Sequence, residues 1–144
     1  MSVHEQINHF LVEIFGRINK IEQRAIAAGL NDEVSISEIH ILEKIGRAGR
    51  SRMSDIARAL DITLATLTVA CEKLAKKDLI LRERAEDDRR VVLISLTPRG
   101  QAVYLYHQQF HHDLIDSALE GLSQDEQKVL SRALRKLEDF FRSV

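Results

Sequence analysis

Arginine side chains gather in one short stretch of the sequence, at Arg82, Arg84, Arg89 and Arg90. A guanidinium binds phosphate through two parallel hydrogen bonds, so this stretch indicates a phosphate-binding surface. Asp88 lies two residues before Arg90, and on an extended chain its carboxylate can hydrogen-bond the guanidinium and orient it. The negative potential of a narrow DNA minor groove favours an arginine presented in this way. The alternative is an ordinary surface ion pair, worth at most about 1 kcal/mol.

The net charge of −1 conceals an uneven distribution of charge along the 144 residues. Residues 47–100 contain 12 basic and 8 acidic side chains, a net charge of +4, whereas the remainder of the chain carries −5. A positive segment between negative ends is the pattern expected where a protein contacts phosphates. Combined with a predicted helix-turn-helix and with the arginines around a predicted hairpin tip, this charge pattern predicts double-stranded DNA as a partner.

Residues 64–77 are predicted to form a helix with one core face and one reading face. Thr63 is a suitable N-cap for this helix. The core face is predicted from Leu64, Leu67, Cys71 and Leu74. The face that would enter the major groove carries Ala65, Thr66, Thr68, Val69 and Lys73. Because it offers no Arg, Asn or Gln for a bidentate base contact, we expect modest direct readout and an A·T-rich site. The alternative is a solvated helix face.

Histidines supply a second group of candidate residues. His107 and His111 are four apart and lie on one face of a predicted helix, and His40 lies on a helix that packs nearby. We predict that they line an effector pocket together with Phe15, with a structural role as the alternative. Imidazoles at this spacing also bind zinc, but no cysteine or compact carboxylate cluster completes a set of ligands. We therefore expect no metal and no cofactor.

Catalytic chemistry is not indicated by the sequence. Cys71, the single cysteine, is expected on the core face of its helix, where it acts as a small apolar side chain rather than as a redox sensor. The chain has no Gly-rich phosphate loop and no assembled nucleophile and base. We expect that the protein is not an enzyme. The lack of a signal peptide or membrane span predicts a soluble, cytoplasmic protein with no membrane partner.

The elements that position these residues follow from apolar periodicity and capping signals. Helices are predicted over 3–27, after the Ser35/Glu38 capping box, over 53–60 and 64–77, from Thr97 to 119, and after the Ser123/Glu126 capping box. Strands are predicted over 79–84 and 91–96, flanking a polar turn at 85–88. A helix-turn-helix followed directly by a hairpin is a winged helix, so the fold class is mainly α, a winged helix-turn-helix with long terminal helices.

A single domain with three regions is expected: an N-terminal dimerisation helix at 1–34, the winged helix-turn-helix region at 35–100, and C-terminal dimerisation helices at 101–144. Apolar stripes on the terminal helices would be buried more fully against a second copy than against this chain's own core, so a homodimer is expected. The interface is predicted to contain Ile7, Phe10, Leu11, Ile14, Leu134, Leu137 and Phe141.

The sequence resembles the MarR family of bacterial winged-helix transcriptional regulators. The resemblance rests on SDIARALDITLATLTVACEKLAKKDLI and on the wing DDRRVVLISLTPRG, which matches the family pattern at Asp88, Arg90, Leu96, Thr97 and Gly100. It implies an obligate dimer, recognition by the helix after Thr63, and Arg90 in the minor groove. The sequence departs from the family at Asp78, where glycine is usual at the end of the recognition helix.

Within this family the chain is most similar to the fatty-acid-biosynthesis repressors of streptococci. The segments INHFLVEIFGRI, SEIHILEKIG, SDIARAL, DDRRVVLISLT and FHHDL carry that closer similarity. It implies repression of fatty-acid synthesis genes, with long-chain acyl-acyl carrier protein as co-repressor. Because the expected dimer has two-fold symmetry, we expect the A·T-rich site to be an inverted repeat. The alternatives are a regulator that responds to a small phenolic or lipophilic effector or to zinc, and a winged helix that binds proteins rather than DNA.

Overall fold

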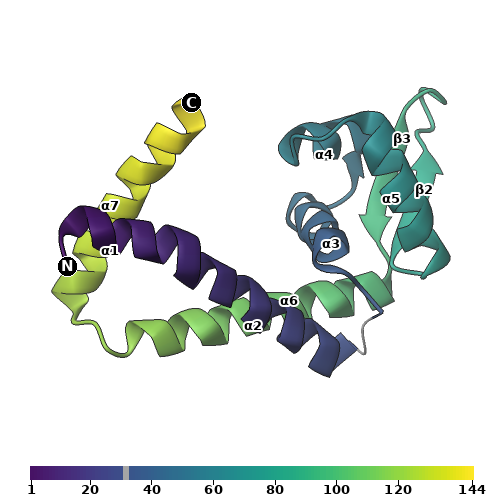
Figure 1. Ribbon diagram of the computed structural model, residues 1–144. Coiled ribbons are helices and arrows are strands. Elements are labelled where there is room, and N and C mark those ends of the chain that lie inside the picture. Colours follow the sequence, from purple (N-terminus) through teal and green to yellow (C-terminus); the bar gives the residue numbers. More distant parts are fainter. Residues whose placement is uncertain (31–32) are drawn as a thin grey trace. The chain divides into compact units, whose positions relative to one another are not determined.

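The computed structural model describes residues 1–30 and 33–144, and the chain divides into two compact units, Met1–His107 and Gln108–Val144. The first unit contains the helices α1 (Val3–His9) and α2 (Phe15–Leu30), joined by a π-helical turn η1 (Phe10–Ile14), and a winged helix. The helix α6 (Pro98–Leu119) begins in the first unit, and α7 (Gln124–Ser143) belongs to the second. Figure 1 shows these elements in order along the chain. Residues 31 and 32 of the predicted region 1–34 lie outside the described residues.

The winged helix consists of helices packed against a small antiparallel sheet. Helices α3 (Ile36–Ala48), α4 (Met53–Ala59) and α5 (Leu64–Lys76) precede the hairpin of β2 (Ile80–Arg84) and β3 (Val92–Leu96). The hairpin pairs from Ile80 opposite Leu96 to Arg84 opposite Val92. A two-residue strand, β1 (Ser51–Arg52), pairs with the other edge of β3 and gives the strand order β1-β3-β2. The predicted fold class is confirmed, whereas β1 was not predicted.

Capping side chains begin the helices at the predicted positions. The Ser35 hydroxyl accepts a hydrogen bond from the backbone N–H of Glu38 at 3.1 Å, and the Glu38 carboxylate accepts one from the N–H of Ser35. Ser123 and Glu126 form the same reciprocal pair at the start of α7. A third capping box at the start of α1 was not predicted. These local bonds satisfy backbone donors that a helix start would otherwise leave unpaired.

The turn after α5 carries Asp78 in a left-handed conformation, with φ of 59°. Aspartate is one of the few side chains that tolerates this region, so the turn survives without the glycine that is usual in the family. The Thr97 hydroxyl donates to the Asp78 carbonyl at 2.6 Å and accepts the Gly100 N–H at 3.0 Å. A Cβ on Gly100 would lie 1.9 Å from the Leu79 carbonyl oxygen, so only glycine fits there. Thr97 and Gly100 therefore hold the start of α6 against the end of α5.

The long N-terminal helix differs in detail from its prediction. It continues to Leu30 rather than ending near residue 27, and Gly29 lies inside α2. A Cβ on Gly29 would collide with the Tyr106 side chain, whose hydroxyl donates to the Ala25 carbonyl at 2.9 Å. Gly29 is therefore a point of close approach between α2 and α6.

The core of the first unit lies between α3, α5 and the sheet. Its most deeply buried side chains are Ile39, Leu42, Ile45, Leu67, Cys71, Leu74, Leu79 and Ile94. The prediction that Leu64 lies on the core face of its helix was wrong, because Leu64 is 50% exposed. Leu64 is the first residue of α5, directly after the N-cap, where its side chain lies beyond the sheet and lines a surface groove.

Cys71 provides a test of this core. Burial raises the pKa of the Cys71 thiol from 9.0 to about 11, although the charge of Arg82 opposes the shift. Because only the thiolate is alkylated, the folded protein should react with iodoacetamide about 100-fold or more slowly than the unfolded chain at mildly alkaline pH. Mass spectrometry of timed reactions measures both rates. Equal rates in native and denaturing buffer would contradict the buried position.

Candidate nucleic-acid interface and buried histidine site

The exposed face of α5 carries the residues predicted to read DNA. Ala65, Thr66, Val69 and Lys73 are exposed, whereas Thr68 is half-buried. The Thr63 hydroxyl accepts the Thr66 N–H at 3.1 Å and donates to the Thr66 hydroxyl oxygen at 2.8 Å. The hydroxyl hydrogen of Thr66 is therefore directed away from Thr63 and is available to an acceptor outside the helix.

The Thr68 hydroxyl has a different role from that of Thr66. It donates to the Leu64 carbonyl one turn earlier, at 2.8 Å. Its oxygen keeps acceptor capacity, but its hydrogen is already used within the helix. Of the two threonines, Thr66 is the better placed to donate to a phosphate or a base edge.

The wing tip is held by its own hydrogen bonds. Asp88 Oδ1 accepts from the backbone N–H of Arg90 at 3.0 Å and from its Nε at 3.3 Å. The predicted pairing of these side chains is present, but the prediction of an extended chain was wrong, because residues 89 and 90 form a turn. Arg84 Nη1 donates to the Arg89 carbonyl at 2.7 Å and closes this turn. The Arg90 side chain is 92% exposed, so the wing presents its guanidinium to solvent.

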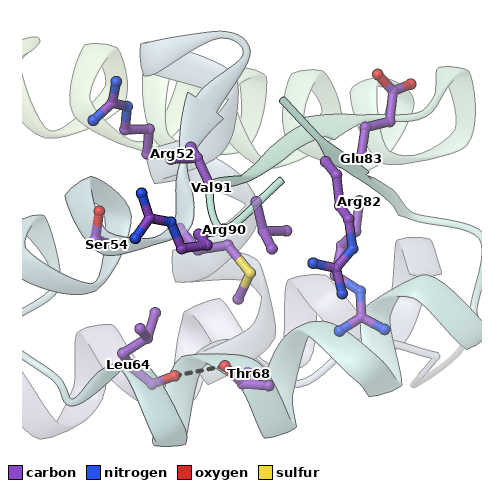
Figure 2. Close-up of a pocket in the computed structure, with 11 residues that line it drawn as sticks. Arg52, Ser54, Leu64, Thr68, Arg82, Glu83, Arg90 and Val91 are labelled. Carbon is purple, nitrogen blue, oxygen red and sulfur yellow. Dashed lines mark hydrogen bonds between the residues drawn. The ribbon is translucent and has the colours of Figure 1, made fainter. Parts of the chain in front are cut away.

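A groove of about 470 Å³ separates the wing from the start of α5. Figure 2 shows Arg52 and Arg90 on one side of it and Arg82 on the other, above Leu64 and Thr68 of α5. The lining includes one acidic side chain, Glu83. Its carboxylate is paired at 2.9 Å with the guanidinium of Arg50, which is not part of the lining. The lining is therefore strongly cationic, as a surface that follows a phosphate backbone must be.

Two of the groove residues, Arg52 and Ser54, were not predicted as part of a site. Both lie at the junction of β1 and α4, and β1 is too short to be predicted. Arg52 is one of the 12 basic residues counted in residues 47–100, but that count did not indicate that its side chain lines the groove.

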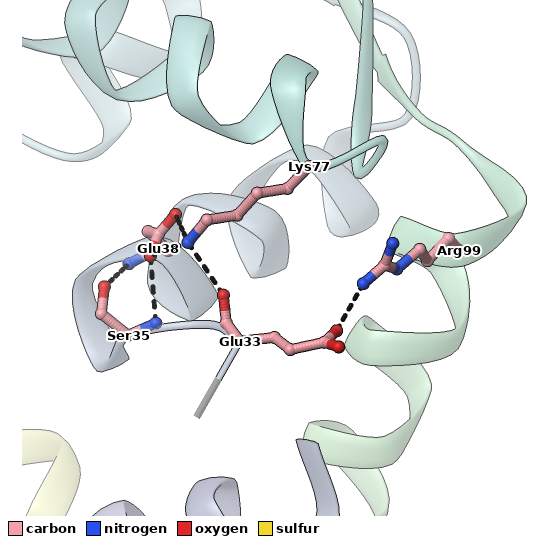
Figure 3. Close-up of polar contacts among 5 residues, drawn as sticks. All are labelled: Glu33, Ser35, Glu38, Lys77 and Arg99. Carbon is pink, nitrogen blue, oxygen red and sulfur yellow. Dashed lines mark hydrogen bonds and ion pairs between the residues drawn. The ribbon is translucent and has the colours of Figure 1, made fainter. Parts of the chain in front are cut away.

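A network of polar contacts secures the end of α5 opposite the wing (Figure 3). Lys77 Nζ donates to the Glu33 carbonyl at 2.8 Å and to both carboxylate oxygens of Glu38 at 3.0 Å. Arg99, in the first turn of α6, forms an ion pair with the Glu33 carboxylate. This network joins the segment before α3 to the C-terminal end of α5 and the start of α6.

A buried imidazole lies between two carboxylates in the same unit. His107 on α6 is 1% exposed. Its Nε2 lies 2.7 Å from Glu22 Oε1 of α2, and its Nδ1 lies 2.5 Å from Glu43 Oε1 of α3. Burial lowers the pKa of His107, but the hydrogen bonds and charges of Glu43 and Glu22 outweigh it and raise that pKa above 6.5. Ionised carboxylates accept hydrogen bonds but donate none. This arrangement therefore favours an imidazolium, which donates a hydrogen bond from each of its two nitrogens.

Other candidate histidines extend this site. His40 Nε2 of α3 lies 3.6 Å from the same Glu22 oxygen. His111 follows His107 by four residues in the sequence of α6 and belongs to the second unit. The sequence showed no compact carboxylate cluster for these histidines, but the fold brings the carboxylates of Glu22 and Glu43 against His107. Phe15, predicted for the same pocket, is 58% exposed.

Glu22 was missed although a signal was present in the sequence. Its neighbours one turn away on α2, Ile18 and Ile26, are apolar and lie on the same helix face. A carboxylate within an apolar stripe must find a partner when the stripe is buried. The partner, His107, is 85 residues away along the chain, so helical spacing alone did not identify it.

Comparison with known proteins gives a family. A model of the MarR family matches residues 34–92. The transcriptional regulator ZitR of Lactococcus lactis is 35% identical over 146 residues, covering 99% of this chain and 100% of that protein. The chain belongs to the MarR family. The family consists of transcriptional regulators, and the matches indicate no enzymatic family. The winged helix described above is thus that of a MarR-family DNA-binding regulator.

Solved MarR structures give the same fold. Streptococcus pneumoniae FabT in complex with DNA matches with a TM-score of 0.92 and 31% identity, over 97% of this chain and 98% of that chain. The structure of Lactococcus lactis ZitR is described as that of a zinc-responsive MarR family member. It matches with a TM-score of 0.72 and 30% identity, over 97% of this chain and 99% of that chain. None of the described helices of this MarR protein combines the length and apolar character needed to span a bilayer.

Removal of the exposed wing arginine should weaken DNA binding. We expect Arg90→Ala to lower affinity for operator DNA, and to reduce the slope of log affinity against log salt by about 0.9, the value for one neutralised phosphate. Arg17→Ala, which removes an exposed arginine from α2, is the control and should leave the slope unchanged. Fluorescence anisotropy over a salt series measures both. Equal slopes for Arg90→Ala and the wild type would exclude a phosphate contact by Arg90.

The contact of Glu38 with Lys77 should make part of the stability depend on pH. Burial raises the pKa of Glu38, but hydrogen bonds from Lys77 and Ser35 hold it below 4.5. A lowered folded-state pKa contributes stability above the unfolded pKa, and the contribution disappears as pH falls through the folded value. Glu38→Gln, which keeps a capping side chain, should therefore lower the free energy of unfolding at neutral pH by about 1 kcal/mol.

The deficit of Glu38→Gln should shrink as the pH falls below 4.5. Urea denaturation over a pH series measures it. Glu126→Gln makes the same change in the capping box at the start of α7, away from Lys77, and is the matched control. A deficit of Glu38→Gln that stays constant with pH would contradict the stabilising role of its charge.

Proposed function

We propose that this chain is a zinc-responsive DNA-binding transcriptional regulator that acts as a homodimer. The observation that carries the proposal is the convergence of His107 Nε2 and His40 Nε2 on Glu22 Oε1, at 2.7 and 3.6 Å. These three residues all belong to the first unit. Its relative ZitR, which matches over nearly the whole chain, is described as zinc-responsive.

The donor atoms suit zinc. Histidine nitrogens and a carboxylate oxygen are common zinc ligands, at about 2.0–2.2 Å from the ion. Two ligand atoms of a tetrahedral site then lie about 3.3–3.6 Å from each other, from the same bond lengths. The distance of 3.6 Å between His40 Nε2 and Glu22 Oε1 fits this range, and the 2.7 Å between His107 Nε2 and Glu22 Oε1 would have to lengthen by under about 1 Å. Bound zinc would supply a cross-link between the helices that carry these ligands.

The positions of the ligands suit a regulator. Glu22 lies on α2, His40 on α3 and His107 on α6, so ligation would restrain three helices at once. Helix α3 contributes Ile39, Leu42 and Ile45 to the core against which α5 packs. A change in the position of α3 would therefore reach the helix that carries the DNA-reading face. This supports a coupling between metal occupancy and DNA affinity.

Dimerisation is supported by apolar side chains that this chain leaves uncovered. In the first unit, Ile7, Phe10 and Leu11 are about half exposed, and Ile14 is partly exposed. In the second unit, Leu134, Leu137 and Phe141 are also about half exposed along α7. Burying such stripes is favourable and requires a partner surface. A two-fold dimer would place recognition helices about one DNA turn, or 34 Å, apart on an inverted repeat.

A second candidate effector is an acyl chain delivered by acyl-acyl carrier protein. The resemblance of segments such as INHFLVEIFGRI and SEIHILEKIG to the fatty-acid-biosynthesis repressors favours it, and with it the repression of fatty-acid synthesis genes. However, an acyl chain requires an apolar pocket, whereas the buried site around His107 contains Glu22 and Glu43. Desolvating these carboxylates against a hydrocarbon would be costly. The chemistry of the site therefore favours a cation over an acyl chain or a small lipophilic effector.

Zinc titration tests the proposal. Metal-free wild-type protein should bind zinc stoichiometrically in competition with a chelating dye, and its operator affinity should differ between zinc and a chelator. Because His40 is half exposed, His40→Ala should fold, lose at least about tenfold in zinc affinity and respond less to zinc. His112→Ala removes an exposed histidine from the same helix as His107 and is the control. Wild-type protein that takes up no zinc would reject the proposal and favour the acyl chain.

A further inference from the structure

Glu43 occupies the side of the buried imidazole that faces away from the candidate ligands. Its Oε1 lies 2.5 Å from His107 Nδ1, and its side chain is 20% exposed. Glu22 and His40 instead converge where Nε2 of His107 points. The two ring nitrogens of an imidazole point in divergent directions, so one ion cannot be bound by both. An ion held with Glu22 and His40 therefore uses Nε2 and leaves Nδ1 to Glu43.

We propose that Glu43 is a positioning residue for the metal site, which accepts the Nδ1–H of His107 and so directs Nε2 of that ring toward Glu22 and His40. The proposal rests on the proposed function and adds to it a residue that is not itself a ligand. A histidine that binds a metal through one nitrogen commonly donates its other N–H to a carboxylate, which fixes the tautomer and the ring orientation. Glu43 meets this description because its Oε1 lies within hydrogen-bond distance of His107 Nδ1, the ring nitrogen that is not directed at Glu22.

The place of Glu43 on α3 gives this contact a second effect. His40 and Glu43 are three residues apart on α3, so both lie on the face directed toward the site. Helix α3 thus supplies one candidate ligand and also orients another, His107, on α6. A displacement of α3 would disturb two of the metal-binding groups together, which is the behaviour expected of an element that couples metal occupancy to the winged helix.

Two substitutions of Glu43 separate positioning from general stabilisation. In Glu43→Gln, the amide oxygen can still accept the Nδ1–H, so zinc affinity should stay within a few-fold of the wild type. Glu43→Leu removes the carboxylate that accepts the Nδ1–H, and affinity should fall by about 10- to 100-fold. Glu72→Leu removes an exposed carboxylate from α5 and is the control. Affinities come from competition with a chelating dye, with the folded fraction of each variant checked by circular dichroism.

Nitrogen NMR of the imidazole rings gives a readout that a purely structural role would not change. In the zinc-loaded wild type, His107 should show a protonated Nδ1 and a metal-bound Nε2, and Glu43→Gln should keep this pattern. Metal bound to Nδ1 in the wild type would overturn the proposal even if Glu43→Leu does not fold. Wild-type zinc affinity in folded Glu43→Leu would also overturn it. If the wild type binds no zinc, the proposed function itself is rejected, and this assignment is rejected with it.

Discussion

The ion-paired imidazole of His107 is the contact on which the arrangement of the first unit's helices depends. It ties α2 to α6 through Glu22 and α3 to α6 through Glu43. Buried charges are costly to desolvate and are retained when each has a partner, so removal of either carboxylate would leave the others poorly matched. Apolar side chains of similar size would join these helices at lower cost. That the chain places charges here instead is consistent with a site whose function requires ionisable groups.

Charge also organises the outer surface of the winged helix, but by a different physical rule. The arginines of the groove are solvated, so their mutual repulsion is weak and their field is available to a phosphate backbone. At the opposite end of α5, Lys77 and Arg99 are paired with acidic residues and add little to that field. The arginines of the groove therefore contribute more to the field at the surface than Lys77 and Arg99 do, although the whole chain is nearly neutral.

Local signals in the sequence identified most of the fold. The capping boxes at Ser35 and Ser123, the cap at Thr63 and the two hairpin strands all form within a few residues of their predicted positions. Each depends on interactions between residues close in the sequence. The predictions failed where a distant partner decides the outcome. β1 exists because β3 offers an edge.

The same distinction applies to the sites. The pairing of Asp88 with Arg90 was predictable because these residues are two apart. His107 and His111 were identified by their helical spacing, whereas Glu22 and Glu43 were not, because only the folded chain brings α2 and α3 to α6. The chemistry of a site assembled from separate helices is visible in the sequence only as single residues out of keeping with their surroundings, such as a glutamate in an apolar stripe.

The hydrogen bonds within the wing tip bear on the entropy of DNA binding. Asp88 holds both the backbone and the guanidinium of Arg90, and Arg84 holds the carbonyl of Arg89. A loop or a long side chain that becomes ordered only on binding costs about 0.5–1.5 kcal/mol for each immobilised group. Here much of that ordering has taken place during folding. The wing therefore loses less conformational entropy when it binds DNA, so a larger part of its attraction to phosphate contributes to the binding free energy.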